Sequence, residues 1–444
     1  CPWLSFRSVP LRKIMDKFVI EGGKRLKGEV TVSGSKNSCL PIFAATLLTD
    51  DACIIRDVPN LRDTNTMFKI LRSLGKNVEF EKGKVRVTST KNPINCIADY
   101  KLVSTMRASF CVLGPLLGRY KIAKVSLPGG CIIGLRPVDL HMKGFKALGA
   151  SILMESGYVV AKAPRLKGNH IYLGGVFGSS VLATDNVMMA AALAKGKSII
   201  EAAACEPEVA DLAEFLIKMG AKIKGHGTPV IEIEGVKHLH AVDHTIIPDR
   251  IEAGTLLLAS LITGGDILVR NAFSHHMGAF IDKMQEAGVN VIKTEKTMRL
   301  QPKKTLRPVN ITTLPYPGFP TDMQAQMMAL MSVTPGISVI TEKIFPDRFM
   351  HVAELNRMGA HIQREGPHAI VEGMSKLLGA PVMASDLRAS ACLVLAGLAA
   401  KGKTSISRIY HLERGYENFD LKLQALGARV WRKGNNCFES SPTT

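Results

Sequence analysis

The sequence predicts a mixed α/β protein of two globular domains, and three observations lead to this prediction. A pattern of helix end, glycine and strand occurs six times at nearly even intervals. A second helical segment, apolar on almost every side, also occurs about once per interval. A strand, a loop and an amphipathic helix lie between the two. A chain of 444 residues is long enough for two domains, so we expect three units in each.

The glycines of the first pattern are expected to end helices. They occur in segments such as LRSLGKNVEF and LQALGARVWR, at spacings of 74, 71, 68, 71 and 68 residues. A glycine directly after a helix adopts the left-handed backbone conformation without the steric cost that a side chain imposes. We expect this conformation at all six positions, which are Gly75, Gly149, Gly220, Gly288, Gly359 and Gly427.

The apolar helices are expected to be buried, because they lack a polar face. Their segments begin near Ser35, Ser104, Ala183, Pro248, Pro320 and Ala384. Each opens with polar or charged residues, such as Thr184 and Asp185 in the third segment. A buried helix must place such residues in water or in a functional site, and its free N–H groups favour anions. Several helix starts facing one cleft would form an anion-binding site.

The composition is that of a globular protein, with 46% hydrophobic and 21% charged residues. The apolar stretches are too short to span a membrane. The nine cysteines are scattered and form no CxxC pair, which argues against a disulfide framework or a zinc site and suits the reducing cytoplasm. Residues 1–14 contain no apolar core of signal-peptide length, so we expect 1–14 and 433–444 to be extensions outside the fold.

The net charge of +19 has three possible explanations: nucleic-acid binding, a solvated basic surface or an anionic small substrate. Nucleic-acid binding is disfavoured, because the basic residues are spread along the chain and only 6% of residues are aromatic. Nucleotide binding through a Walker loop or a GxGxxG motif is not supported, and no metal-binding pattern is visible.

The segment PGGCIIGLRP, from Pro128 to Pro137, is a candidate catalytic loop. Three of its residues are glycine, and Cys131 lies among them, five residues before Arg136. A nearby guanidinium lowers a thiol pKa, so Cys131 is a candidate nucleophile or acid. The alternative is a glycine-rich turn with an incidental cysteine.

Cations occur at equivalent places in different repeats, mostly at the starts of the apolar helices or in the loops after strands. Arginine grips phosphates and carboxylates with paired hydrogen bonds, so a convergent set would bind such groups. For any single member, the alternative is a solvated surface charge. The set comprises Lys36, Arg107, Arg136, Arg250, Arg348, Arg388 and Arg414.

Asp322 is the main acidic candidate. It opens a helix, so one interpretation is an N-terminal cap. A carboxylate among many cations would also stay ionised and could accept a proton from a hydroxyl. His141 and His351 are single histidines on helices and are expected to be core or surface residues.

Several motifs together resemble the UDP-N-acetylglucosamine 1-carboxyvinyltransferase family of enolpyruvyl transferases. They include SGSKNSCLPI, SLPGGCIIGLRPVDLH, IPDRIEAGT, FPTDMQAQ and IYHLERGYE, and the resemblance extends from about residue 15 to 432. The family fold is an inside-out α/β barrel made twice, each half from three repeats. The resemblance implies one domain of 15–35 plus 248–432, and a second domain of 36–247 that bears the Cys131 loop.

The resemblance also implies the reaction, in which the enolpyruvyl group of phosphoenolpyruvate moves to the 3-hydroxyl of UDP-N-acetylglucosamine and phosphate is released. Cys131 would be the catalytic cysteine and the target of fosfomycin, and Asp322 would take the proton from the hydroxyl. Lys36 and Arg414 would also be catalytic residues. Phosphoenolpyruvate would contact Lys36, Asn37, Cys131, Arg136, Arg348, Arg388 and Arg414. The UDP-sugar would contact Asn37, Arg107, Arg136, Pro137, Val138, Asp139, Leu140, Lys167, Ser180, Asp322 and Ile344.

This family acts in the cytoplasm at the first committed step of peptidoglycan synthesis, and the resemblance implies no cofactor, metal, nucleic acid, membrane or obligate protein partner. Three alternatives remain: a shikimate-type enolpyruvyl transferase, a catalytically silent paralogue with a binding role, and a nucleic-acid binder. The residues Cys131 and Asn37 argue against the first, and the presence of Cys131, Lys36 and Asp322 argues against the second.

Overall fold

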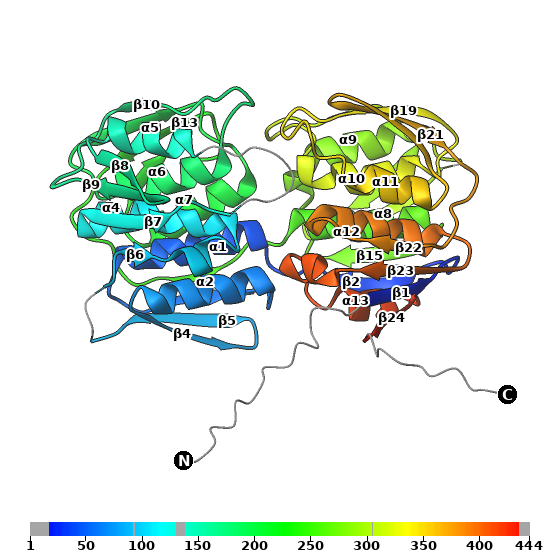
Figure 1. The fold of residues 1–444 in the computed structure, drawn as a ribbon, viewed down its shortest axis with the longest axis horizontal. Helices are drawn as coiled ribbons and strands as arrows, with labels where there is room; N and C mark the ends of the chain where they lie inside the picture. The colour runs from blue at the N-terminus through cyan, green and yellow to red at the C-terminus, as the bar shows by residue number, and fades with distance from the viewer. Residues whose placement is uncertain (1–16, 92–93, 130–137, 304, 435–444) are drawn as a thin grey trace, which may run out of the picture.

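The computed structural model describes residues 17–91, 94–129, 138–303 and 305–434, which form two bodies of mixed α/β structure (Figure 1). The hydrophobic core of the first body is built from residues within 39–246. The core of the second body combines residues within 18–32 with residues within 251–430. The predicted α/β class is confirmed. No helix in these ranges is long and apolar enough to cross a membrane.

The described strands form six four-stranded sheets, three in each body. In every sheet but one, the first two strands of the order run parallel and the other pairs are antiparallel. In the sheet that contains β2 (Lys27–Thr31), the parallel pair is the last two strands of the order, β15 (Asp266–Arg270) and β2. The repeated arrangement agrees with the repeats in the sequence.

The sheets of the first body, each in strand order, are as follows: β14 (Asp243–Thr245), β3 (Cys53–Arg56), β5 (Lys84–Ser89) and β4 (Lys76–Glu81); β6 (Ile97–Ala98), β7 (Ile122–Ser126), β9 (Tyr158–Lys162) and β8 (Ser151–Glu155); β10 (His170–Tyr172), β11 (Lys197–Glu201), β13 (Val230–Glu234) and β12 (Lys222–Lys224). Those of the second body are β16 (Val289–Lys293), β17 (Thr297–Pro302), β15 (Asp266–Arg270) and β2 (Lys27–Thr31); β18 (Ile311–Thr312), β19 (Gly336–Thr341), β21 (His368–Gly373) and β20 (His361–Glu365); β22 (Pro381–Met383), β23 (Lys403–Ser407), β1 (Lys17–Glu21) and β24 (Arg429–Lys433).

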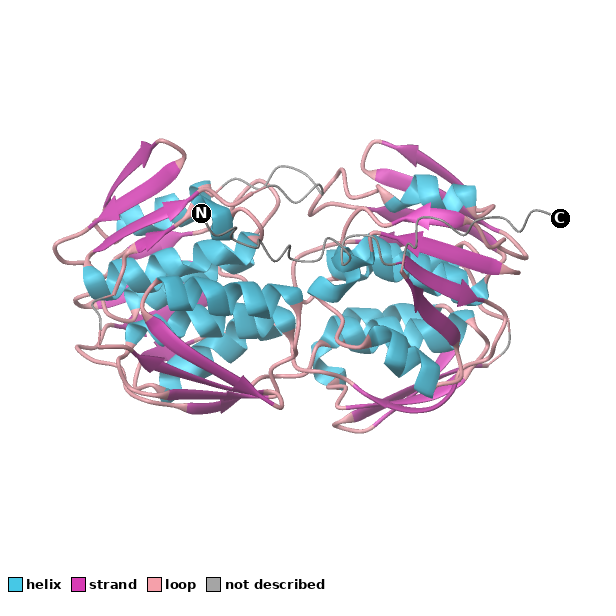
Figure 2. Cartoon of the chain, turned by 60° about the horizontal axis from the view of Figure 1, so that its bottom comes forward, coloured by secondary structure: helices cyan, strands magenta, loops and turns pink. Residues whose placement is uncertain are grey.

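Helices occupy the interior of each body and strands its periphery (Figure 2). The predicted apolar helices are buried along nearly their whole length: α1 (Lys36–Ala45), α4 (Leu113–Tyr120), α6 (Val181–Ala191), α8 (Arg250–Ile262), α10 (Gln324–Met331) and α12 (Leu387–Ala399). The helices between the strands are α2 (Arg62–Ser73), α5 (Asp139–Ala147), α7 (Pro207–Lys218), α9 (Gly278–Glu286), α11 (His351–Arg357) and α13 (Phe419–Ala425), with a short α3 (Tyr100–Val103). The 3₁₀ turns are η2 (Thr46–Leu48), η3 (Arg107–Val112), η4 (Ser274–His276), η5 (Thr321–Met323) and η6 (Ile409–Arg414).

The six repeat glycines all have the predicted left-handed conformation. Their φ angles are 102°, 91°, 102°, 87°, 90° and 93° in chain order. One expectation about the buried helices is wrong. Helix α6 begins at Val181 rather than near Ala183, so Thr184 and Asp185 lie inside the helix and are fully buried, instead of facing water or a cleft.

The chain passes between the bodies at two adjacent segments, near Gly34 and Pro248. The Ser35 N–H donates to the Ile247 carbonyl at 2.7 Å, and the Asp249 N–H donates to the Ser33 carbonyl at 2.9 Å. A side chain at Gly34 would meet the Asp57 carbonyl oxygen at 1.9 Å, so only glycine fits there. Both connections are therefore held together by backbone hydrogen bonds.

Strands β1 and β2 belong to the second body. Strand β1 pairs with β23 and β24, and β2 pairs with β15. Lys433, which we assigned to the C-terminal extension, is the last residue of β24 and lies opposite Lys17. The strand therefore extends one residue beyond the expected boundary, because pairing with β1 continues to that position. The extension 1–14 lies outside the described residues.

Candidate active site

Asp322 forms ion pairs with two arginines of the second body. It lies in η5, where its Oδ1 is 2.8 Å from Nη1 of Arg348 and its Oδ2 accepts a hydrogen bond of 2.8 Å from Nη2 of Arg388. Burial tends to raise the pKa of Asp322, but the charges of Arg388 and Arg348 outweigh it and hold this pKa well below its usual range. Asp322 is thus ionised at neutral pH, as expected. The alternative interpretation as a helix cap is wrong, because its side chain caps neither η5 nor α10.

The two arginines make further polar contacts that hold them in place. Arg388 lies in the first turn of α12, where Asp386 caps the helix, and its Nη1 also donates to the Tyr416 hydroxyl at 3.2 Å. Arg348 donates from Nη1 to the Thr321 hydroxyl at 3.0 Å. The side chains of both arginines are less than a tenth exposed, whereas that of Asp322 is 26% exposed. The carboxylate is therefore the member of this group that a solute can reach most readily.

A second group joins Lys36 of the first body to Arg414 of the second body through Asp63. Lys36 begins α1 and its Nζ donates to Oδ2 of Asp63 at 3.3 Å. Arg414 ends η6 and donates to the same carboxylate from Nε at 2.8 Å and from Nη2 at 3.4 Å. We did not single out Asp63 from the sequence, because an acid in the first turn of a helix is ordinary.

The two groups are close enough to influence each other. The positive charge of Lys36 contributes to the low pKa of Asp322, although the two residues belong to different bodies. Each group contains two cations and one carboxylate, so each keeps one net positive charge. An anionic solute beside the two groups would therefore meet a net positive potential.

Arg250 does not join this set. It begins α8, and its Nε and Nη2 donate to the two carboxylate oxygens of Glu208 in α7, at 2.9 and 3.2 Å. Because Glu208 belongs to the first body, this pair links the two bodies. The guanidinium of Arg250 is thus paired with a buried carboxylate, as that of Arg414 is with Asp63.

The other predicted site residues have the following positions in the fold. Asn37 follows Lys36 in α1 and is half-buried, and Arg107 begins η3 and raises the local positive charge near His141. Val138 and Leu140 are half-buried and Asp139 is exposed at the start of α5. Lys167 is exposed before β10, Ser180 caps α6, and the Ile344 N–H donates to Glu342 at 2.9 Å. The predicted residues Cys131, Arg136 and Pro137 lie outside the described residues.

His141 and His351 were expected to be core or surface residues, and both lie in the core. Both are at most 4% exposed, and burial lowers the pKa of His141 to about 3, helped by the charge of Arg107. The Nδ1 atom of His141 lies 3.0 Å from Nδ2 of Asn186, which fits a neutral imidazole that accepts a hydrogen bond. Among the described residues, no group of three or more His, Cys, Asp or Glu side chains is placed to hold a metal ion.

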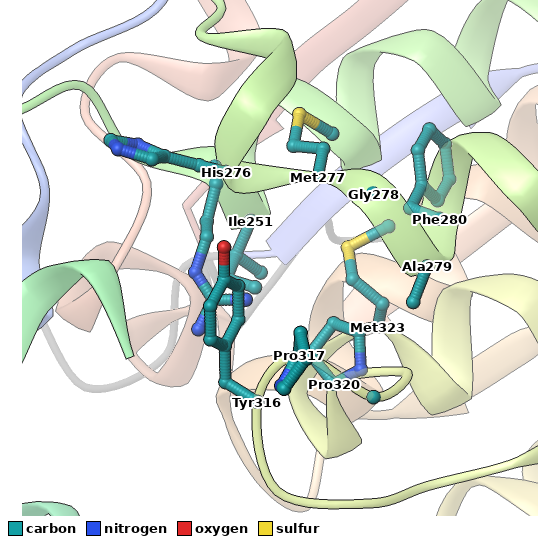
Figure 3. A pocket seen from close by; sticks show the side chains of 12 residues that line it. Ile251, His276, Met277, Gly278, Ala279, Phe280, Tyr316, Pro317, Pro320 and Met323 are labelled. Carbon is teal, nitrogen blue, oxygen red and sulfur yellow. The ribbon is translucent and has the colours of Figure 1, made fainter. Parts of the chain in front are cut away.

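A small pocket lies beside Arg250, between the loop before η5 and the start of α9 (Figure 3). Its lining is mainly apolar; the figure places His276 and Met277 on one side and Tyr316 and Pro317 on the other. Neither Asp322 nor Lys36 lines it. Because the pocket lacks the paired cations that a doubly anionic ligand requires, we assign the anion-binding role to the two groups above instead.

Comparisons with known proteins identify the family of this chain. The family model for EPSP synthase (3-phosphoshikimate 1-carboxyvinyltransferase) matches residues 20–423. The UDP-N-acetylglucosamine 1-carboxyvinyltransferase of Geotalea uraniireducens is 56% identical over 418 residues, which cover 94% of this chain and 99% of that protein. UDP-N-acetylglucosamine 1-carboxyvinyltransferase 2 of Carboxydothermus hydrogenoformans is 54% identical over 420 residues, with the same coverage.

The chain belongs to the UDP-N-acetylglucosamine 1-carboxyvinyltransferase family. Among solved structures, this member of the family is similar to the enolpyruvyl transferase NikO from Streptomyces tendae, with a TM-score of 0.85, 25% identity and coverage of 95% of this chain and 99% of that one. EPSP synthase from Acinetobacter baumannii has the same fold, with a TM-score of 0.71 at 17% identity over 94% of this chain and all of that one.

Proposed function

We propose that this member of the family transfers the enolpyruvyl group of phosphoenolpyruvate to the 3-hydroxyl of UDP-N-acetylglucosamine and releases phosphate. The observation that carries the proposal is the pair of two-cation groups, Lys36 with Arg414 and Arg348 with Arg388, contributed by both bodies beside the ionised Asp322. Both substrates are polyanions. Their mutual repulsion must be cancelled before their reacting atoms can approach, and the cations supply that cancellation.

The reaction is an addition followed by an elimination. In the addition, the 3-oxygen of the sugar bonds to C2 of phosphoenolpyruvate, the hydroxyl proton passes to Asp322, and a proton from the Cys131 thiol is added to the methylene carbon. In the elimination, the bond from C2 to the phosphate oxygen breaks, the methyl carbon returns a proton to the Cys131 thiolate, and phosphate departs with the proton that Asp322 had accepted. The low pKa of Asp322 keeps the carboxylate ionised at neutral pH, and a proton that it accepts is released easily.

We further propose that the two bodies are the domains 36–247 and 15–35 plus 248–432, each an inside-out α/β barrel of three repeats. The arrangement of helices inside and sheets outside supports this description (Figure 2). Phosphoenolpyruvate would lie between the domains against Lys36, Asn37, Arg136, Arg348, Arg388 and Arg414, under the Cys131 loop. The UDP-sugar would extend along Arg107, Arg136, Pro137, Val138, Asp139, Leu140, Lys167, Ser180 and Ile344. A cytoplasmic enzyme of peptidoglycan synthesis is the corresponding biological role.

Phosphate release from phosphoenolpyruvate tests this function. Purified protein is incubated with phosphoenolpyruvate and either UDP-N-acetylglucosamine or 3-phosphoshikimate. The second acceptor is included because the matching family model carries the name of the shikimate-type enzyme. We expect phosphate only with UDP-N-acetylglucosamine. Release only with 3-phosphoshikimate would replace the proposal with the shikimate-type reaction, and release with neither acceptor would refute both.

Fosfomycin is expected to alkylate Cys131 and no other thiol. Burial raises the pKa of each cysteine that the structure describes, namely Cys39, Cys53, Cys96, Cys111, Cys205 and Cys392, and thiols with a raised pKa react slowly. Intact-mass spectrometry with UDP-N-acetylglucosamine present should show one adduct, which peptide mapping assigns to Cys131. The Cys131→Ala variant should stay unlabelled. An adduct that persists in this variant, on Cys1 or Cys437 for example, would contradict the assignment.

A further inference from the structure

Asp63 occupies an unusual position for a first-turn acid. Such a residue normally stabilises its own helix through the dipole and remains solvated. Asp63 is instead 4% exposed, and both of its oxygens accept hydrogen bonds from cations outside α2. Burying a carboxylate is costly unless it is paired, so the location of Asp63 is explained by these two partners rather than by α2 itself.

The two partners come from opposite sides of the boundary between the bodies. Lys36 belongs to the first body and Arg414 to the second, 351 positions from Asp63 in the sequence. Arg414 binds Asp63 through Nε and Nη2, which lie along one edge of the guanidinium. Contacts at two nitrogens fix the plane of that group, and the contact at Nζ fixes the end of the lysine chain.

Asp63 and Asp322 both share their charge between two cations, but they differ in access. The side chain of Asp322 is 26% exposed, whereas that of Asp63 is 6% exposed and lies behind its cations. A solute can therefore contact Asp322 directly and would meet Lys36 and Arg414 rather than Asp63. The exposures of those two cations are 12% and 26%.

We propose that Asp63 is a positioning residue that sets the spacing and orientation of Lys36 and Arg414 for binding the phosphoenolpyruvate anion between the two bodies. The inference rests on the proposed function and names a residue that this function does not include. Without Asp63, the two like charges would repel each other, and each long side chain would have to be ordered when the substrate binds. Because Asp63 orders both side chains before the substrate binds, the binding free energy does not include this entropic cost.

The test is the Asp63→Asn variant, which keeps the shape of the side chain and removes its charge. We expect its KM for phosphoenolpyruvate to rise by between about tenfold and about a hundredfold, because displacement of a binding group by about 1 Å has effects of that size. The KM for UDP-N-acetylglucosamine should change by less than about twofold. The matched control is Asp243→Asn, which removes an ion pair with Arg56 that is nearly half exposed and should leave both values unchanged.

Asp63→Glu keeps the charge but moves the cations by one methylene group. It should fold as the wild type does and raise the KM for phosphoenolpyruvate less than Asp63→Asn does, which a purely structural role would not produce. If Asp63→Asn does not fold, Asp63→Glu provides the test. A KM for phosphoenolpyruvate in Asp63→Glu equal to that of the wild type would overturn the inference. Equal KM values for Asp63→Asn and Asp243→Asn would also overturn it. Wild-type protein that releases no phosphate would instead refute the proposed function itself.

Discussion

Asp322→Asn is expected to lower kcat by about a thousandfold, which is within the usual range for loss of a proton-accepting group. The amide has nearly the same shape as the carboxylate but cannot take up the hydroxyl proton. It also removes the negative charge that Arg348 and Arg388 share. The KM for phosphoenolpyruvate should change far less than kcat, because the four cations remain. Steady-state phosphate release at saturating concentrations of both substrates measures the effect.

A matched control for Asp322→Asn is Asp347→Asn. Asp347 also pairs with an arginine, Arg364, but its side chain is 74% exposed and it belongs to neither two-cation group. We expect this variant to keep wild-type kcat. Circular dichroism of both variants establishes that they fold. If folded Asp322→Asn retained more than about a tenth of wild-type kcat, Asp322 would not be the proton acceptor.

Lys422→Met is expected to destabilise the second body by about 3–5 kcal/mol. Lys422 donates from Nζ to Oε1 of Glu252 at 2.5 Å, and Glu252 is 2% exposed. The other carboxylate oxygen of Glu252, Oε2, accepts a hydrogen bond of 2.8 Å from the Ser33 N–H, next to the connection between the bodies. Loss of Lys422 leaves a buried carboxylate without its counter-charge, and such a group costs far more than a lost surface ion pair. Thermal unfolding should show a midpoint lowered by roughly 10 °C.

The effect of Lys422→Met should depend on pH in a defined direction. Burial already raises the pKa of Glu252, and the charge of Lys422 opposes this increase. Without Lys422 the pKa in the folded state rises further above that in the unfolded state. The destabilisation is therefore complete at neutral pH and decreases as the pH falls and Glu252 becomes protonated. A loss of stability that is the same at pH 7.5 and pH 5 would contradict this explanation.

Two further variants act as controls for Lys422→Met. The double variant Glu252→Gln/Lys422→Met removes the unpaired charge and should recover much of the lost stability. Lys197→Met removes an ion pair with Glu232 in which both side chains are about half exposed, so we expect little change in the midpoint. If Lys197→Met and Lys422→Met shifted the midpoint equally, burial of the charge would not be the cause.

Local features of the fold could be predicted from the sequence because short-range rules determine them. The glycines from Gly75 to Gly427 have the expected left-handed conformation, since a helix followed directly by a strand requires it at that point. The apolar segments are buried helices because no polar face is available to water. The start of α6 was misplaced by two residues, because Val181 and Leu182 continue the helix toward its cap at Ser180.

The pairing of charges could not be predicted, because it depends on contacts between residues far apart in the chain. The sequence identifies Lys36, Arg250 and Arg414 as cations at equivalent helix or loop positions, without the carboxylate that each one meets. Arg250 is occupied by Glu208, and Asp63 joins the other two. Neither acid has a local signal beyond its location in the first turn of a helix, where acids are common.

The position of β1 in the middle of its sheet has a consequence for biosynthesis. This strand emerges from the ribosome before every other strand that the structure describes, but its neighbours β23 and β24 are the last two of those strands. The first body can fold as soon as β14 has emerged, whereas β1 has both edges unpaired until β23 and β24 have been made. An unpaired apolar strand is prone to aggregation, so the nascent chain needs protection during that interval. The speed of elongation and chaperone capture should therefore affect the yield of the second body more than that of the first.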